Sequence, residues 1–313
     1  MTVLMLGTFS SVADFLIGLE TDGLLSGFMT KYLSDGEPYL QTPHGSMICY
    51  WDGIAHYVMY ILMLYALSWG RSYREVGLYW AGSIGHSMIV FIPGNVVGKF
   101  GLRTSFLLNI PYMFLPYWSM AKFLRERPTL CVQQKKTRCI WCRPLDLLLV
   151  FCLIAAFGVA FVRGFAALDA QDDLFKIYRV EYEPYLSDPV SYPKIQMLVY
   201  MFYYVPYYVL AIYGLVYQGN VWMPDWSLIH AGAAVQAQVS HIGASLHSGT
   251  DPQLRVPDDT IIRSSFWLIN VVLLLIVPQL LALRCNVNKS FFVRPVNHDE
   301  KPVTKSAMLK KNE

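Results

Sequence analysis

The stretch Cys49-Tyr50-Trp51-Asp52-Gly53-Ile54-Ala55-His56-Tyr57 begins an apolar run that continues to Trp69. The run is long enough to cross a bilayer as one helix. Asp52 and His56 are four residues apart, so on a helix they lie on one face, one turn from each other. Because ionisable groups are costly inside a membrane, such a face usually turns toward protein interior or a wet cavity. We therefore predict that this face marks the functional site.

The composition of the whole chain supports a membrane location. The chain has 313 residues, of which 55% are hydrophobic and only 15% are charged, and its mean hydropathy is +0.37. A soluble domain carries about 25% charged residues. The predicted fold class is therefore an all-α, polytopic membrane protein. The sequence contains no phosphate loop, nucleophile triad, cofactor motif or nucleic-acid patch, so we expect no cofactor and no nucleic-acid partner.

The hydrophobic pattern predicts about eight transmembrane helices. The first run lacks a basic leading region and carries Asp14, which indicates a span and not a secretory signal peptide. The predicted spans cover residues 2–20, 47–69, 76–98, 105–123, 145–168, 194–217, 226–248 and 264–284.

The loops divide by charge. The segment from Lys122 to Arg143 and the tail after Cys285 are basic, whereas the loops at 21–46, 169–193 and 249–263 are rich in acids. By the positive-inside rule the basic segments are cytoplasmic and the acidic loops face the lumen or the exterior. The basic linker is expected to contact anionic lipid headgroups.

A four-residue motif occurs twice. Glu37-Pro-Tyr-Leu40 and Glu183-Pro-Tyr-Leu186 each follow the first helix of a half and precede its second. This register predicts a parallel duplication of four spans. The expected divisions are a first unit at 1–121, a basic cytoplasmic linker at 122–144, a second unit at 145–284 and a cytoplasmic tail at 285–313.

Polar side chains within the predicted spans form one set in each half. Asp52, His56 and Asp14 are the candidate catalytic residues, because an acid beside an imidazole can donate and accept protons. The sets could line a small-molecule cavity, or they could only bond helix to helix. Asp14 and Arg163 could pair across the halves, with snorkelling of Arg163 or simple bonding from helix to helix as the alternatives. The candidate ligand-binding residues are Trp51, His86, Asn95, Trp118, Gln196, Gln238 and His241.

Two cysteine and asparagine motifs carry less weight. Cys139 and Cys142 with Cys131 have zinc-like spacing but lack a fourth ligand, so we predict no metal site and consider acylation of these thiols instead. Asn288-Lys-Ser290 fits a glycosylation sequon, but the predicted topology places it in the cytoplasm.

Six motifs spread over nearly the whole chain are Gly36-Glu-Pro-Tyr-Leu40, Ile48-Cys-Tyr-Trp-Asp-Gly53 with His56-Tyr57, Gly77-Leu-Tyr-Trp80, Pro93-Gly-Asn95, Tyr192-Pro-Lys-Ile-Gln-Met197 and Gln236-Ala-Gln-Val-Ser-His-Ile-Gly-Ala-Ser-Leu-His247. Together they resemble the transmembrane six superfamily, which consists of multi-pass proteins with two tandem EXPERA domains. The likeness is nearest to the first-described member, and such proteins usually carry further N-terminal helices. EXPERA domains also occur in emopamil-binding protein, a sterol Δ8–Δ7 isomerase, and in the sigma-two receptor.

The resemblance implies a sterol- or lipid-binding cavity within a four-helix unit. The isomerase uses a His and a Glu on its first EXPERA helix. The corresponding positions fall near Asp14 and Gly18 in the first half of this chain, and near Arg163 and Ala167 in the second half. That catalytic pair is therefore not retained. The second-helix acid of the isomerase corresponds to Asp52, which is retained. The resemblance thus favours binding over catalysis.

Three functions follow from these expectations. The leading hypothesis is an endomembrane protein of lipid metabolism or trafficking that binds sterol or another lipid beside Asp52 and His56. The alternatives are a sterol isomerase-like enzyme using Asp52, His56 and Asp14, and a transporter of lipids or small molecules. The final Lys310-Lys311-Asn312-Glu313 resembles a dilysine retrieval signal and favours the endoplasmic reticulum, with the lysosomal membrane as the alternative.

Overall fold

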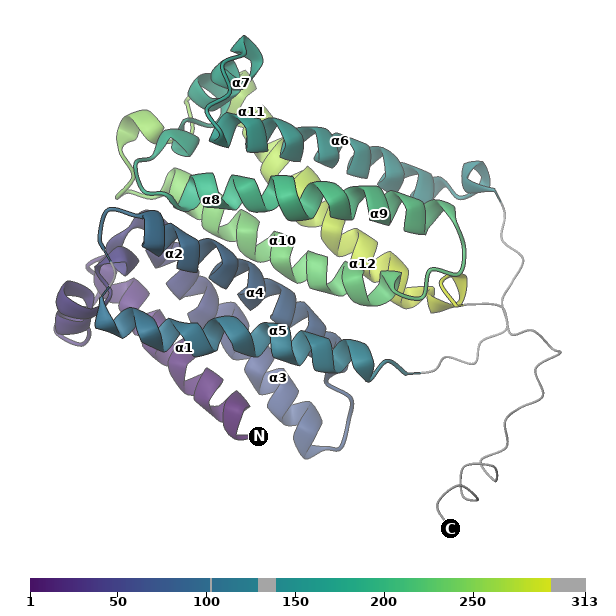
Figure 1. Cartoon of the computed structure of the whole chain (residues 1–313), viewed down its shortest axis with the longest axis horizontal. Coiled ribbons are helices and arrows are strands. Elements are labelled where there is room, and N and C mark those ends of the chain that lie inside the picture. Colours follow the sequence, from purple (N-terminus) through teal and green to yellow (C-terminus); the bar gives the residue numbers. More distant parts are fainter. Residues whose placement is uncertain (102, 129–138, 294–313) are drawn as a thin grey trace.

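The computed structural model describes residues 1–101, 103–128 and 139–293. These residues form helices and turns with no strand, which confirms the all-α class. The first half lies on one side of the molecule and the second half on the other (Figure 1). The first half consists of α1 (Thr2–Thr21), α2 (Pro43–Trp51), α3 (Tyr57–Ser68), α4 (Arg74–Val97) and α5 (Asn109–Arg125). The second half consists of α6 (Pro144–Ala167), α7 (Asp173–Ile177), α8 (Tyr192–Val199), α9 (Val205–Val216), α10 (Met223–Leu246), α11 (Thr260–Trp267) and α12 (Val277–Val287).

Among the residues that the structure describes, six helical segments are long and apolar enough to cross a membrane, which agrees with a polytopic protein. Each lies at a predicted span, and α5 and α10 lie at the remaining two, so the count of eight membrane crossings stays a prediction. The six segments are Val3–Thr21, Pro43–Ser68, Arg74–Val97, Pro144–Ala167, Tyr192–Val216 and Thr260–Val287.

The second helix of each half contains a π-helical segment. Asp52–His56 joins α2 to α3, and Tyr200–Tyr204 joins α8 to α9. Such a segment fits one extra residue into the helix and often occurs at functional sites, because it shifts the side chains around it. The pair predicted to form the site thus lies on an irregular turn of an otherwise continuous helix.

The two Glu-Pro-Tyr-Leu motifs adopt the same local structure. Each follows a π-helical turn (Tyr32–Gly36 and Tyr178–Tyr182) and begins a 3-10 turn at its proline. The φ and ψ angles are −126° and 68° at Glu37 and −135° and 70° at Glu183. This shared backbone turns both glutamates in the same way, and both are buried.

The halves meet where α4 crosses α10. A Cβ added at Gly82 would overlap the backbone carbonyl of Ile229, and one added at Gly232 would overlap the carbonyl of Tyr79. Gly82 and Gly232 are 150 positions apart in the sequence, and so are Tyr79 and Ile229. Each glycine thus meets the counterpart of the residue that the other glycine meets, as a two-fold relation between the helices produces. Without side chains at these glycines, the two backbones can approach closely, as small residues allow in membrane helices.

Charged residues reinforce this junction at one end. The guanidinium of Arg74 forms two hydrogen bonds of 2.8 Å to the Asp225 carboxylate, and Arg127 adds a third of 2.5 Å. Glu75 of α4, 150 positions before Asp225, pairs with Lys289 of the second half. Both acids lie in the first turn of their helix, where the helix dipole favours a negative charge.

Candidate functional site

Asp52 and His56 form a close pair, as their spacing predicts. His56 Nδ1 lies 2.5 Å from Asp52 Oδ1. On the other side of the ring, His56 Nε2 lies 2.8 Å from the Ser83 hydroxyl of α4, which also accepts a 2.9 Å hydrogen bond from the Trp51 indole. His56 is buried, whereas Asp52 is partly accessible. Asp52 is therefore the accessible member of a close pair whose imidazole is hydrogen-bonded to Ser83.

The hydrogen bonds orient the imidazole. The Trp51 indole can only donate, so the Ser83 hydroxyl accepts from it and has its own hydrogen to give to His56 Nε2. The ring hydrogen of neutral His56 is then on Nδ1, the nitrogen that lies 2.5 Å from Asp52 Oδ1 without forming a hydrogen bond to it. A carboxylate this close to an imidazole is suited to hold or move a proton.

Two further carboxylates of the first half approach this pair. Asp14 of α1 is half buried and interacts electrostatically with both Asp52 and Glu37. Glu37 accepts a 2.5 Å hydrogen bond from Asn109 Nδ2. Burial and the neighbouring Glu37 raise the pKa of Tyr32, which therefore stays neutral and donates to that carboxylate. Three acids thus share an environment in which His56 is the basic partner of Asp52.

The second half contains the corresponding glutamate with a different partner. Glu183 forms a buried ion pair with Arg163 and accepts a 3.1 Å hydrogen bond from Asn270 Nδ2. His241 Nε2 lies 3.4 Å from the other carboxylate oxygen, and the Tyr178 hydroxyl accepts from Arg163 Nε at 3.1 Å. Burial alone would raise the pKa of Glu183, but Arg163 and His241 hold that pKa well below its usual range.

Of the alternatives expected for Arg163, bonding from helix to helix agrees with the structure, because Arg163 Nη2 donates to Asn270 at 2.7 Å. Arg163 neither pairs with Asp14 across the halves nor snorkels to the surface. It is completely buried beside Glu183 of its own half. The reason is proximity: the inward turn of the Glu-Pro-Tyr-Leu motif brings the Glu183 carboxylate to the first helix of the half, and a buried cation requires such a partner.

The other predicted ligand-binding residues divide between three places. His241 lies at the Glu183 pair, while Gln238 donates to the Tyr200 hydroxyl and Gln196 donates to the Ala237 carbonyl at 2.7 Å. These three residues therefore make contacts within the second half.

His86 and Asn95 of α4 lie instead at the junction between the halves. His86 Nδ1 is 3.3 Å from the Tyr204 hydroxyl, and Asn95 accepts a hydrogen bond from Tyr192. Trp118 of α5 is 63% exposed and is not brought to either cluster. Ligand binding by these residues stays a prediction.

A cavity of about 480 Å³ lies between α9 and the start of α10, with mostly aromatic walls that include Tyr203, Tyr207, Trp222 and Trp226. Its volume falls in the range of small-molecule sites. The imidazole of His230, which stacks on Tyr207 at 3.9 Å, has no hydrogen-bond partner among the described residues. The cavity expected beside Asp52 and His56 stays a prediction.

Sequence reasoning missed Glu37 and Glu183 as site residues. Both were interpreted as charges of acidic loops, yet they are only 4% and 3% exposed and point into the helix bundle. The available signal was the repeated motif itself, because a glutamate repeated in register is easier to explain by a buried contact than by a solvated charge. The asparagine partners on the last helices could not be identified from spacing.

The part of the chain that the structure describes contains no group of three or more His, Cys, Asp or Glu side chains able to hold a metal ion. Cys139 and Cys142 are free and exposed, while Cys131 lies outside the described residues.

Comparisons with known proteins assign both halves of the chain. Residues 1–135 match the family model "Transmembrane 6 superfamily member 2-like, transmembrane domain", and residues 170–285 match the EXPERA (EXPanded EBP superfamily) model. The chain is 46% identical to transmembrane 6 superfamily member 2 of Rattus norvegicus over 301 residues, which covers 93% of this chain and 79% of the relative.

The proteins of the same name from Mus musculus and Homo sapiens are each 45% identical, with 93% of this chain and 78% of the relative covered. No solved structure matches the chain. The nearer likeness to the first-described member stays a prediction.

Proposed function

Since the chain belongs to the transmembrane 6 superfamily, we propose that it binds a sterol or a related lipid at the polar centre of its first half. The EXPERA match supports a lipid-related membrane protein in general. The proposal adds the ligand class and the place, beside Asp52 and His56.

The observation that carries the proposal is the difference in charge between the halves. In the second half the buried Glu183 is neutralised by Arg163. In the first half Asp14 interacts electrostatically with both Glu37 and Asp52, and the imidazole of His56 pairs with Asp52. A carboxylate oxygen accepts hydrogen bonds, so the hydroxyl of a sterol or another lipid is a suitable partner there.

The apolar surroundings of this acid cluster suit the rest of such a ligand. Ile17, Tyr60, Met63 and Trp80 belong to the same buried cluster of the first half. A site with apolar walls and a few converging polar groups is the usual form of a small-molecule site. The polar centre then orients the ligand while the walls supply most of the binding free energy.

The test is photoreactive sterol labelling of the full chain in native membranes, with the labelled peptides identified by mass spectrometry. We expect Asp52→Asn and His56→Ala to reduce labelling severalfold, with the label on peptides of α1 to α4. Asp258→Asn is the matched control, because Asp258 is a solvent-exposed acid outside the helices. Unchanged labelling of both site variants, or a label confined to the aromatic cavity beside α9, would refute the proposed site.

The Asp52–His56 geometry also supports a second candidate, a sterol isomerase-like activity. Isomerisation needs one group to protonate the alkene and another to remove a proton. Asp52 with its 2.5 Å partner His56, and Asp14 nearby, are the residues available for both steps. Failure of the purified protein to convert a Δ8 sterol, under conditions in which a control isomerase succeeds, would exclude this activity.

The proposed compartment is the endoplasmic reticulum, with the lysosomal membrane as the alternative. It depends on Lys310 and Lys311, which lie outside the described residues. Replacing both lysines by serine is expected to release the protein from the endoplasmic reticulum, as seen by fluorescence microscopy beside a compartment marker. An unchanged distribution would contradict a dilysine signal.

A further inference from the structure

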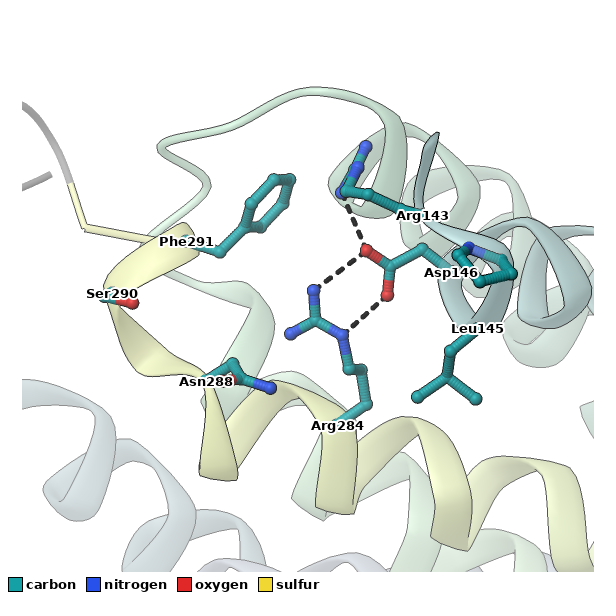
Figure 2. A pocket seen from close by; sticks show the side chains of 8 residues that line it. Arg143, Leu145, Asp146, Arg284, Asn288, Ser290 and Phe291 are labelled. Carbon is teal, nitrogen blue, oxygen red and sulfur yellow. Dashed lines mark hydrogen bonds and ion pairs between the residues drawn. The ribbon is translucent and has the colours of Figure 1, made fainter. Parts of the chain in front are cut away.

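A second polar site lies between the start of α6 and the end of α12 (Figure 2). It is a pocket of about 360 Å³ whose walls include Arg143, Asp146, Arg284, Asn288 and Ser290. We propose that this pocket binds a phosphate-bearing anion, and that the anion is the phosphomonoester headgroup of a phospholipid. The pocket is separate from the Asp52–His56 pair, so the proposal does not depend on sterol binding.

The charges of the pocket do not balance. The Asp146 carboxylate, which is 2% exposed, accepts hydrogen bonds from Arg143 Nη1 at 2.7 Å and from Arg284 Nε and Nη2 at 2.6 and 2.8 Å. One carboxylate thus serves two guanidinium groups and leaves one positive charge uncompensated within the pocket. Arginine is well suited to bind phosphate, because its planar fork matches the phosphate oxygens.

Both arginines also retain unused donors. Arg284 Nη1 and Arg143 Nε are buried and have no hydrogen-bond partner among the described residues. In Figure 2 the third guanidinium nitrogen of Arg284 points away from Asp146, toward the side on which Asn288 and Ser290 lie. A buried charged donor without a partner costs free energy. Phosphate oxygens would satisfy these donors, and the Asn288 amide and Ser290 hydroxyl can add further hydrogen bonds.

The arginines are held in place before any ligand arrives. The ring of Phe291 lies 4.5 Å from Arg143 Cζ and 5.6 Å from Arg284 Cζ. Arg143 Nη2 also donates to the Leu215 carbonyl at 3.0 Å. Because the side chains are already ordered, little conformational entropy is lost on binding. The start of α6 at Pro144 also lines the pocket and contributes the positive end of the helix dipole.

The surroundings favour a lipid as the source of the phosphate. Leu145 lines the pocket and is 51% exposed, and Leu148, one turn further along α6, is 58% exposed. Trp141, just before α6, is also exposed, as is common for tryptophan at the membrane interface. A phosphate in the pocket would therefore have an apolar surface beside it along which acyl chains can lie.

The experiment measures equilibrium binding to the purified full chain in detergent micelles. The probes are dioctanoyl phosphatidic acid, dioctanoyl phosphatidylcholine and inorganic phosphate. Ser290→Asp adds a carboxylate to the pocket without removing a member of the Arg143–Asp146–Arg284 cluster. Ser72→Asp is the matched control, because Ser72 is an exposed serine in the loop before α4. Arg284→Lys keeps the charge but removes the planar fork and its free nitrogen.

We expect the wild type to bind phosphatidic acid more tightly than phosphatidylcholine. Ser290→Asp should weaken binding of phosphatidic acid by about tenfold or more through like-charge repulsion, and Ser72→Asp should not. Arg284→Lys should weaken it as well. Inorganic phosphate that binds as tightly as phosphatidic acid would support the anion site but identify free phosphate as the ligand. Equal affinity for both lipids, or equal effects of Ser290→Asp and Ser72→Asp, would overturn the proposal.

Discussion

Gly82→Ala tests the close crossing of α4 and α10. The added Cβ would meet only backbone atoms of Ile229, which no side-chain rotation can move away. The helices must therefore separate, and overpacking of this kind costs about 3 kcal/mol, at the upper end of measured values. Alanine also recovers about 1 kcal/mol of helix propensity relative to glycine. The net destabilisation is then about 2 kcal/mol.

The matched control is Gly158→Ala in α6. Gly158 has open space around its Cβ position, so this substitution retains only the gain in helix propensity of about 1 kcal/mol. The two variants should differ by about 3 kcal/mol, or roughly 6–12 °C in the unfolding midpoint. Heating the purified protein in micelles and measuring the remaining folded fraction by size-exclusion chromatography gives these midpoints.

The double variant Gly82→Ala/Gly232→Ala sharpens the test. Both glycines lie at the same crossing, so one separation of the helices relieves both overlaps. The double variant should therefore be less destabilised than the sum of the single variants. A Gly82→Ala midpoint at or above that of Gly158→Ala, or strictly additive losses, would refute the tight crossing.

Four further predictions concern other parts of the chain. Arg163→Met should destabilise the protein by about 3–5 kcal/mol in thermal denaturation, because it leaves the buried Glu183 carboxylate unpaired, and a neutral result would contradict this role of the ion pair. The pKa of Glu183 is lowered in the folded protein, so the stabilisation that its carboxylate gives the fold is present above about pH 4.3 and is lost as the pH falls toward the folded-state pKa. Acid denaturation of Glu183→Gln should therefore be less steep than that of the wild type. Identical denaturation curves would count against this role of Glu183. Maleimide should modify the exposed Cys139 before the buried Cys285, as peptide mass spectrometry can measure, and equal rates would argue against the packing at Cys285. Asn288 should carry no N-linked sugar, and a mobility shift after glycosidase treatment would invert the predicted topology.

The long helices could be predicted from the sequence, because they are apolar runs whose pattern is local, whereas the five-residue α7 lies in a segment predicted to be a loop. The Asp52–His56 pair could also be predicted, because four-residue spacing on a helix is enough to bring two side chains together. The inward direction of Glu37 and Glu183 could not be predicted from the sequence. Glu37 is bonded to Asn109, 72 residues away, and the corresponding contact of Glu183 spans 87 residues. Contacts at such separations leave no periodic signal in a single sequence.

The polar centres of the two halves differ in the charge beside their buried glutamate. Asp14 of α1 and Arg163 of α6 each lie near the glutamate of their own half. An arginine in that place closes the polar centre as a buried ion pair, so the second half has little charge left for a ligand. Asp14 instead places a second acid near Glu37, and a proton or the hydrogen-bond donor of a ligand would reduce the repulsion between the two carboxylates. This difference in charge is the reason for proposing that the ligand binds at the polar centre of the first half and not at that of the second.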